Sequence, residues 1–174
     1  MILGCIPNVD ENDVSSVSNA VRDNLVGPFG PYVDRFEKKI SNFTKAKYSV
    51  GVSSGTSALH LSLLSIDIDS NNIIIVPDTS FVATINVVKY IGSIPLLIDI
   101  DPKTMGMSVE ALSQVLETQF IQQEGDTIHK KSKLKLGAVI PVDLYGHPVD
   151  MEPIQKLSQK YNFKVIQDAS ESLG

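Results

Sequence analysis

Short apolar segments alternate with segments of helical period along most of this chain, and that alternation limits the folds it can adopt. Apolar runs at 73–76, 94–98, 136–142 and 163–167 are each separated from the next by a stretch long enough for a helix. Strands joined in this way cannot form simple hairpins, because parallel neighbours need a crossover connection of about a dozen residues or more. The pattern therefore predicts a doubly wound α/β fold with right-handed crossovers.

The remaining elements follow from apolar residues spaced three and four apart and from the residues that can cap a helix. Ser108 and Asp150 are expected to cap the helices that they precede. A short strand is expected at 48–52. We expect helices at about 12–25, 32–43, 56–65, 81–91, 108–116 and 150–161.

One segment, 119–135, is polar and shows no period, although it carries several lysines. We interpret it as a solvated surface excursion rather than a phosphate-binding patch. No internal repeat or linker is visible, so we expect one domain or part of one.

Composition excludes several classes of protein. Hydrophobic residues make up 43% of the 174 residues and charged residues 20%, which is typical of a globular protein and not of a disordered one. The net charge of −5 argues against binding of nucleic acid. No apolar run is long enough to span a bilayer, and the N-terminal residues lack the basic start of a signal peptide. Cys5 has no partner for an internal disulfide, which fits a cytoplasmic protein, and no histidine pair has metal-ligand spacing, so no metal is expected.

In an open parallel sheet, ligands bind beyond the carboxyl ends of the strands. The residues at 53–58 follow the strand expected at 48–52 and open a helix. A helix N-terminus offers free N–H groups and the positive end of the helix dipole, which suits a phosphate. Gly55 would let the backbone approach closely, and Thr56 and Ser57 would add hydroxyl donors. An ordinary capped turn is the alternative reading of the same residues.

Two further side chains follow strands at the same edge. Phe81 comes after the strand at 73–76, where its ring either stacks on a flat heterocycle or joins the core. Asp168 ends the strand at 163–167, and a buried carboxylate there is costly unless something pairs with it. A protonated ring nitrogen would pair with Asp168; alternatively, its carboxylate caps the turn that follows.

Together these features describe a ligand with a phosphate, a flat ring and a basic ring nitrogen. Pyridoxal 5′-phosphate (PLP) has all three, and an acid on its ring nitrogen keeps the ring an electron sink. The lysine of the ATP-binding P-loop and the glycine fingerprint of dinucleotide-binding folds are both missing at 53–58, which disfavours a plain nucleotide-binding domain.

A series of ordered motifs covers nearly the whole chain. They are Val26-Gly-Pro-Phe-Gly30, Phe36-Glu37, Ser54-Gly-Thr-Ser-Ala-Leu59, Val76-Pro-Asp-Thr-Ser-Phe81 with Ala83-Thr84, Asp99-Ile-Asp101, Pro141-Val-Asp-Leu-Tyr-Gly146, Asp150-Met151 and Asp168-Ala-Ser-Glu-Ser-Leu-Gly174. With them the chain resembles the DegT/DnrJ/EryC1/StrS family of PLP-dependent nucleotide-sugar aminotransferases. The resemblance implies the large domain of fold type I PLP-dependent transferases, a three-layer doubly wound and mostly parallel sheet, here truncated.

The resemblance also implies roles for individual residues. Thr56 and Ser57 would hold the cofactor phosphate, with Gly55 shaping the turn. Phe81 would stack on the pyridine ring, and Asp168 would pair with its nitrogen.

Glu171 falls where the family contacts the 3-oxygen of the cofactor, so it joins the expected cofactor-binding residues. The family's Schiff-base lysine lies downstream of the motif that begins at Asp168, and no lysine of this chain lies in a matching segment. We therefore expect residues 1–174 to be the N-terminal part of the PLP-binding large domain. Without the lysine segment and the C-terminal small domain, the chain by itself is expected to be inactive.

For the complete protein the resemblance implies a cytoplasmic homodimer. It would move an amino group from an amino acid, typically glutamate, to a keto group of a nucleotide-linked sugar. Surface-polysaccharide or nonulosonic-acid biosynthesis is the implied pathway class, with no nucleic-acid or membrane partner. The alternative is a truncated, non-catalytic module that binds PLP or pyridoxamine phosphate, or only dimerises.

Overall fold

The computed structural model describes residues 6–173, so Cys5 lies outside the described part of the chain. The chain forms two compact units, one up to Gly51 and the other from Val52 onward. Within residues 6–173, no helix is both long enough and apolar enough to cross a bilayer.

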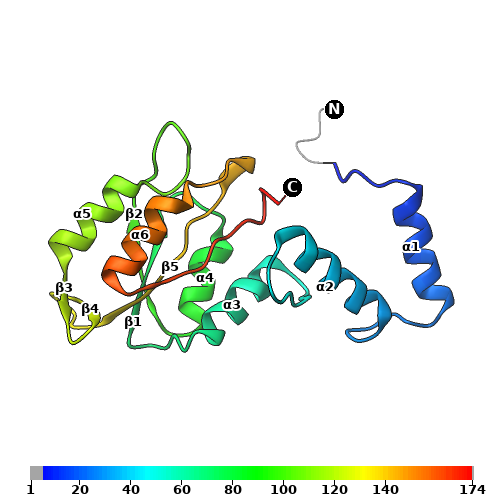
Figure 1. Cartoon of the computed structure of the whole chain (residues 1–174), viewed down its shortest axis with the longest axis horizontal. Helices are drawn as coiled ribbons and strands as arrows, with labels where there is room; N and C mark the ends of the chain where they lie inside the picture. Colours follow the sequence, from blue (N-terminus) through cyan, green and yellow to red (C-terminus); the bar gives the residue numbers. More distant parts are fainter. Residues whose placement is uncertain (1–5, 174) are drawn as a thin grey trace. The chain divides into compact units, whose positions relative to one another are not determined.

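The first unit consists of two helices, α1 (Glu11–Arg22) and α2 (Pro31–Thr44), close to the expected positions (Figure 1). The side chain of Asp10 caps α1 by accepting hydrogen bonds from the N–H groups of Asn12 and Asp13. Helix α2 begins with proline, whose missing N–H is of no consequence in a first helical turn.

The strand predicted at 48–52 does not form, and that prediction is wrong. A strand needs a neighbouring strand to receive its N–H and C=O groups, and none lies beside this segment among residues 6–173. The N–H of Gly51 instead donates to the Glu37 carboxylate, with 2.7 Å between nitrogen and Oε1.

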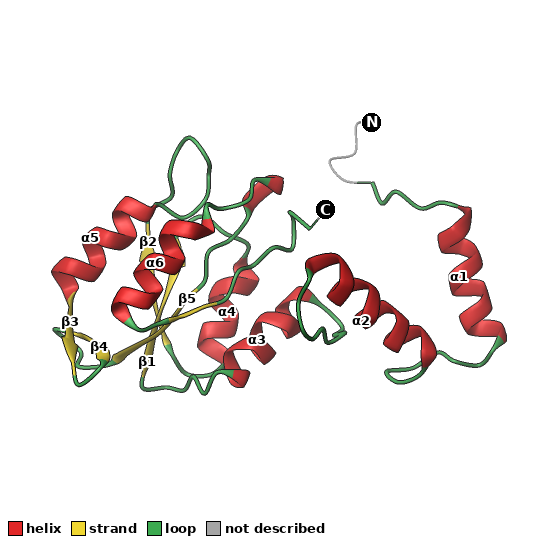
Figure 2. Cartoon of the chain, viewed as in Figure 1, coloured by secondary structure: helices red, strands yellow, loops and turns green. Residues whose placement is uncertain are grey.

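The second unit is built on a mixed sheet whose central part is parallel (Figure 2). Strands β1 (Asn72–Pro77), β2 (Ile94–Ile98), β5 (Lys135–Val139) and β6 (Lys164–Val165) run parallel in the order β2-β1-β5-β6. The predicted α/β class and mostly parallel sheet are therefore confirmed. Strands β5 and β6 are shorter than the apolar runs from which they were predicted.

The polar segment 119–135 was predicted to be a surface excursion, and that prediction is wrong. The segment forms a hairpin that extends the sheet. Strands β3 (Phe120–Gln123) and β4 (Asp126–His129) pair antiparallel, and β4 continues onto β5. Glu124 and Gly125 both have positive φ, as a two-residue turn that matches strand twist requires.

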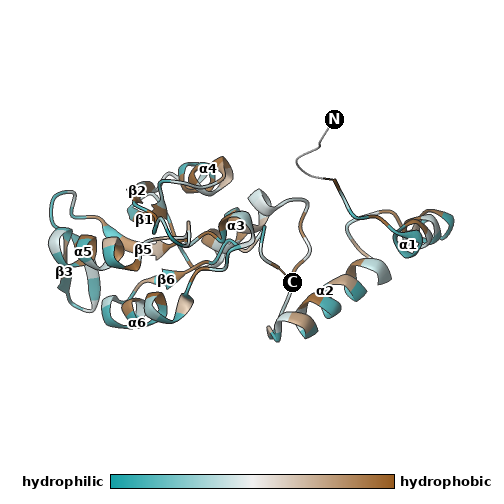
Figure 3. Cartoon of the chain, turned by 90° about the horizontal axis from the view of Figure 1, so that it is seen from above, coloured by the Kyte–Doolittle hydropathy of each residue, from teal (hydrophilic) through white to brown (hydrophobic). Residues whose placement is uncertain are grey.

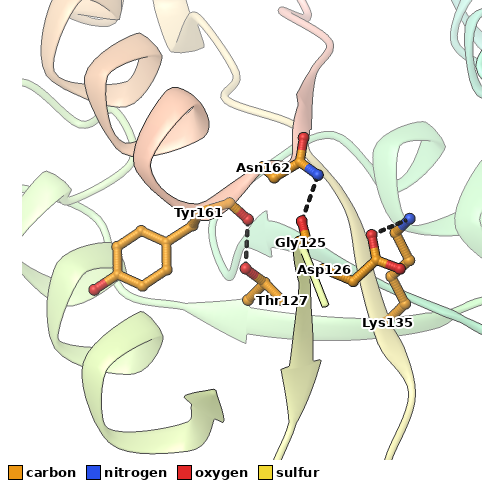
Figure 4. A network of polar contacts seen from close by, with 6 residues as sticks. All are labelled: Gly125, Asp126, Thr127, Lys135, Tyr161 and Asn162. Atoms are coloured by element: carbon orange, nitrogen blue, oxygen red, sulfur yellow. Dashed lines mark hydrogen bonds and ion pairs between the residues drawn. The ribbon is translucent and has the colours of Figure 1, made fainter. Parts of the chain in front are cut away.

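Figure 4 shows how the hairpin covers the end of α6 (Met151–Tyr161). The Thr127 hydroxyl donates to the carbonyl of Tyr161, and the Asn162 amide donates to the carbonyl of Gly125 over 2.6 Å. These bonds satisfy backbone carbonyl groups that a helix end and a hairpin turn leave free. Asp126 and Lys135 form an ion pair beside them.

Helices cover both faces of the sheet, so the unit has three layers (Figure 3). Helices α3 (Gly55–Ser65) and α4 (Val82–Tyr90) pack against side chains such as Ile74 and Val76. Helices α5 (Val109–Gln119) and α6 pack on the opposite face against Ile73 and Ile75. Alternate residues of one strand thus enter opposite cores, which explains why β1 is buried throughout and apolar after Asn72.

The predicted caps of α5 and α6 are confirmed. Ser108 accepts a hydrogen bond from the N–H of Ala111, and Asp150 accepts one from the N–H of Glu152. Both helices therefore begin where a short polar side chain can receive a free backbone donor.

Candidate functional site

A cavity of about 360 Å³ lies where the carboxyl ends of the parallel strands meet the N-termini of α3 and α4. This volume is within the usual range for ligand pockets, about 300–1,000 Å³. The edge is the one at which the sequence predicted a ligand. The residues that line the cavity are Ser54, Gly55, Thr56, Leu59, Phe81, Ala83, Val142, Asp143, Leu144, Asp168, Ser170 and Glu171.

Asp168 is buried at the floor of this edge, with 7% of its surface exposed. It continues the parallel pairing of β5 and β6, because its N–H donates to the carbonyl of Pro141 over 2.9 Å. Its Oδ2 accepts a hydrogen bond from the Thr84 hydroxyl at 3.1 Å, and its Oδ1 accepts one from the Ser170 hydroxyl at 2.6 Å. Only hydroxyl and backbone donors contact this carboxylate, so among residues 6–173 no cationic side chain competes there with a cationic ligand atom.

The N-terminus of α3 forms another part of the cavity wall. Ser54 is the N-cap, and its hydroxyl accepts a hydrogen bond from the N–H of Ser57 at 3.1 Å. Among residues 6–173, no acceptor occupies the N–H groups of Gly55 and Thr56, which therefore stay available to an anion.

Ser57 is placed differently from the prediction. Its hydroxyl lies within hydrogen-bond distance of the hydroxyls of Ser53 and Ser54, and the residue does not line the cavity. Gly55 and Thr56 do line the cavity. Of the predicted cofactor-binding residues, the structure therefore brings all but Ser57 to the cavity, namely Gly55, Thr56, Phe81, Asp168 and Glu171.

Phe81 precedes α4 and is 67% exposed, which excludes the alternative that its ring belongs to the core. Phe81 lines the cavity, although β1, which ends at Pro77, is fully buried. An aromatic face open to a pocket can stack on a flat heterocycle.

Glu171 lies on the cavity wall and binds the protein backbone. Its Oε2 accepts a hydrogen bond from the N–H of Tyr145 at 2.6 Å. Tyr145 belongs to the 3-10 turn η1 (Leu144–Gly146) and has a φ of 54°, so the carboxylate holds a left-handed turn in place. Among residues 6–173, the other carboxylate oxygen has no backbone partner.

A buried acid that the sequence did not single out closes the same wall. Asp143 is 1% exposed and accepts hydrogen bonds from the N–H of Val149, the amide of Gln167 and the hydroxyl of Ser172. It ties the segment after β5 to the segment after β6. Its position after the apolar run at 136–142 was the available signal, since that is the rule by which Asp168 was found.

The polar groups of the cavity fit a ligand that has an anionic end and a cationic end. The α3 terminus offers free N–H groups, while Asp143, Asp168 and Glu171 bring carboxylates and no lining residue is basic. Such a set matches a phosphate at one end and a protonated ring nitrogen at the other. Within residues 6–173, no three His, Cys, Asp or Glu side chains gather as a metal ion would need.

The relatives of this chain include sugar aminotransferases. The family model of the DegT/DnrJ/EryC1/StrS aminotransferases matches residues 7–174. The GDP-perosamine synthase of Escherichia coli O157:H7 is 33% identical over 97% of this chain and 42% of its own length. The UDP-2-acetamido-2-deoxy-3-oxo-D-glucuronate aminotransferase of Pseudomonas aeruginosa is 32% identical over 83% of this chain and 36% of its own length.

Solved structures agree with these relatives. An aminotransferase from Psychrobacter cryohalolentis superposes with a TM-score of 0.83 at 26% identity, over 98% of this chain and 40% of that one. NtdA from Bacillus subtilis, solved with bound cofactor PMP, gives a TM-score of 0.77 at 26% identity, over 100% of this chain and 38% of that one. The chain thus spans about 40% of the length of the proteins that it matches. From fold, motifs and family match alike, the chain belongs to the DegT/DnrJ/EryC1/StrS aminotransferase family.

Proposed function

We propose that the complete protein is a PLP-dependent aminotransferase that transfers an amino group from an amino acid to a keto group of a nucleotide-linked sugar. The observation that carries the proposal is the cavity, where free N–H groups, an exposed aromatic ring and a buried carboxylate line one space. Relatives named for GDP- and UDP-linked sugars support the substrate class.

Each cavity residue has a role in this proposal. The N–H groups of Gly55 and Thr56 bind the phosphate, and the Thr56 hydroxyl adds a donor. Phe81 covers one face of the ring, and Asp168 keeps a proton on the ring nitrogen. Ser57, predicted to touch the phosphate, acts through the N-cap of α3 by its bonds to Ser54.

PLP supplies an electron sink that stabilises negative charge on the carbon next to the amine, and this chemistry belongs to the cofactor. The protein's part is to bind, to orient and to hold protons. By holding a proton on the ring nitrogen, Asp168 would keep the positive charge that the electron sink requires. Glu171 holds the η1 turn through its bond from the Tyr145 N–H, and its other carboxylate oxygen can accept a hydrogen bond from the ligand.

No lysine lines the cavity, so the amine that holds the cofactor is proposed to come from outside the described residues. The proposal includes glutamate as donor, a homodimer, the cytoplasm as compartment, and surface-polysaccharide or nonulosonic-acid biosynthesis as context. The alternative function is a non-catalytic module that binds PLP or pyridoxamine phosphate, or only dimerises.

Binding of pyridoxamine 5′-phosphate (PMP) tests the proposal, because this ligand needs no lysine. Its affinity is measured by calorimetry beside that of an analogue with carbon in place of the ring nitrogen. We expect PMP to bind more tightly than the analogue, and Asp168→Asn to weaken PMP binding by about ten- to a hundredfold, as loss of a charge-assisted hydrogen bond predicts. Absence of PMP binding, or equal affinity for both ligands, contradicts the proposal.

Amino transfer from glutamate to a keto sugar nucleotide, followed by mass spectrometry, separates the two candidate functions. An aminated sugar nucleotide supports the enzyme. PMP binding without any turnover by the complete protein supports the binding module.

A further inference from the structure

We propose that the hydroxyl groups of Thr84 and Ser170 form a clamp on the Asp168 carboxylate, and that this clamp is the reason for glycine at position 55. The clamp fixes both carboxylate oxygens and so sets the direction in which Asp168 meets the ring nitrogen. The inference rests on the proposed function, since it assigns positioning residues to that ring-nitrogen site.

Thr84 supplies one half of the clamp from α4. The residue is fully buried, and its hydroxyl donates to Asp168 Oδ2 over 3.1 Å. The other buried residues of α4 are the apolar Ala83, Val87 and Val88. A valine would fill the same space as Thr84 without the cost of burying a hydroxyl, so the hydroxyl is explained by its bond to the carboxylate.

Ser170 supplies the other half from the segment after β6. Its hydroxyl donates to Asp168 Oδ1 over 2.6 Å, and its N–H approaches the same oxygen at 3.3 Å. Because Thr84 holds the second oxygen from a different element, any rotation of the carboxylate breaks at least one of these bonds. Asp168 is thus oriented before a ligand arrives, which lowers the entropy lost on binding.

Gly55 makes room for the Ser170 half of the clamp. A Cβ atom at position 55 would lie 3.2 Å from the Ser170 hydroxyl oxygen, closer than ordinary contact. Gly55 has no positive φ and lies in the first turn of α3, where backbone conformation does not call for glycine. Close packing against Ser170 therefore accounts for this residue, and it couples the phosphate end of the cavity to the ring-nitrogen end.

The test compares Thr84→Val, Thr84→Ser and Ser170→Ala with the unaltered protein. Each is titrated with PMP and with the analogue that has carbon in place of the ring nitrogen. We expect Thr84→Val to weaken PMP binding by about tenfold, as loss of one hydrogen bond to a charged group predicts, and to leave the analogue unaffected. Thr84→Ser keeps the hydroxyl and should restore most of the affinity.

Thr127→Val is the matched control. Thr127 is also fully buried, and its hydroxyl donates to the Tyr161 carbonyl in the hairpin of Figure 4. The substitution removes a comparable hydrogen bond outside the cavity, so we expect lower stability with unchanged affinity for both ligands. A loss of PMP affinity equal to that of Thr84→Val would show that the effect is general destabilisation, and would overturn the clamp.

Position 55 gives an independent test by a double-mutant cycle. Gly55→Ala should weaken PMP binding, and in the Ser170→Ala background much of this effect should vanish because the crowded hydroxyl is gone. Additive effects would overturn the role of Gly55. If Thr84→Val does not fold, the cycle and Ser170→Ala still test the clamp, because Ser170 is exposed.

Two outcomes distinguish the inference from the function on which it rests. If the unaltered protein does not distinguish PMP from the analogue, the proposed function fails. If the unaltered protein does distinguish the two ligands, but Thr84→Val and Ser170→Ala bind PMP with the affinity of the unaltered protein, the function stands and the clamp is refuted.

Discussion

Gly137 in β5 offers a test of how closely the sheet packs against Ile68 and Asn72. A Cβ atom at this position would lie 2.3 Å from the Ile68 Cδ1 atom and 3.1 Å from two atoms of Asn72. The Ile68 methyl group would have to retreat by at least about 1 Å to reach ordinary contact at 3.4 Å. Ile68 is 7% exposed and packs in the core between the sheet and α3 and α4, so moving its methyl group breaks buried contacts even though Ile68 and Gly137 also line a cavity.

The expected cost of Gly137→Ala follows from these contacts. Overpacking a core costs about 1–3 kcal/mol, whereas replacing glycine by alanine restricts the unfolded chain and returns about 0.4–1 kcal/mol. Crowding outweighs this gain, so the free energy of unfolding should fall by about 1–2 kcal/mol. Urea denaturation followed by far-UV circular dichroism measures the change.

Ile68→Val removes the atom that the new methyl group would strike. Alone it should cost about 0.5–1.5 kcal/mol, as a deleted buried methyl group does. Combined with Gly137→Ala, it should leave the protein about as stable as Ile68→Val alone, with a coupling of about 1 kcal/mol. Gly27→Ala, where no atom lies within 4 Å of the new Cβ, serves as the uncrowded control. Purely additive losses in the double variant would refute the argument.

Three further substitutions test the site and the surrounding fold. Phe81→Ala should weaken PMP binding by about three- to tenfold through loss of stacking, with an unchanged melting temperature because the ring is 67% exposed; equal affinity would refute its role. Ser108→Ala removes the cap that accepts from Ala111, so unfolding should cost about 1 kcal/mol less while PMP affinity, by calorimetry, stays the same. Lys135→Ala breaks the ion pair with Asp126; the two side chains are 44% and 41% exposed, respectively. Urea titration should show that the free energy of unfolding falls by less than about 1 kcal/mol and that this loss shrinks in high salt. A larger loss that does not depend on salt would contradict a surface pair.

Local signals in the sequence were sufficient for the helices and for the central strands. Periodic apolar residues and short polar caps such as Ser108 and Asp150 act within a few residues, so they can be read without knowledge of the rest of the fold. The rule that ligands bind beyond the carboxyl ends of strands placed Phe81 and Asp168 at the cavity edge, where the structure also has them.

Structural features that depend on partners distant in the sequence could not be predicted from such local signals. The segment 48–52 has the composition of a strand but lacks a neighbour to pair with, whereas the polar segment 119–135 forms a hairpin because Gly125 permits the turn and β5 offers an edge. Pairing energy belongs to two segments at once, so composition of one alone does not report it.

The same reason separates the residues of the site that were found from those that were missed. Asp168 and Thr84 meet across 84 positions of sequence, and Gly55 meets Ser170 across a still longer span. The chemical types along the chain indicated a phosphate, a ring and a basic nitrogen. Ser170 lies only two residues from Asp168, so its contact is local. The buried Thr84 hydroxyl reaches the other oxygen only through packing in three dimensions, because hydrogen bonds and steric limits act over a few ångströms of space rather than along the chain.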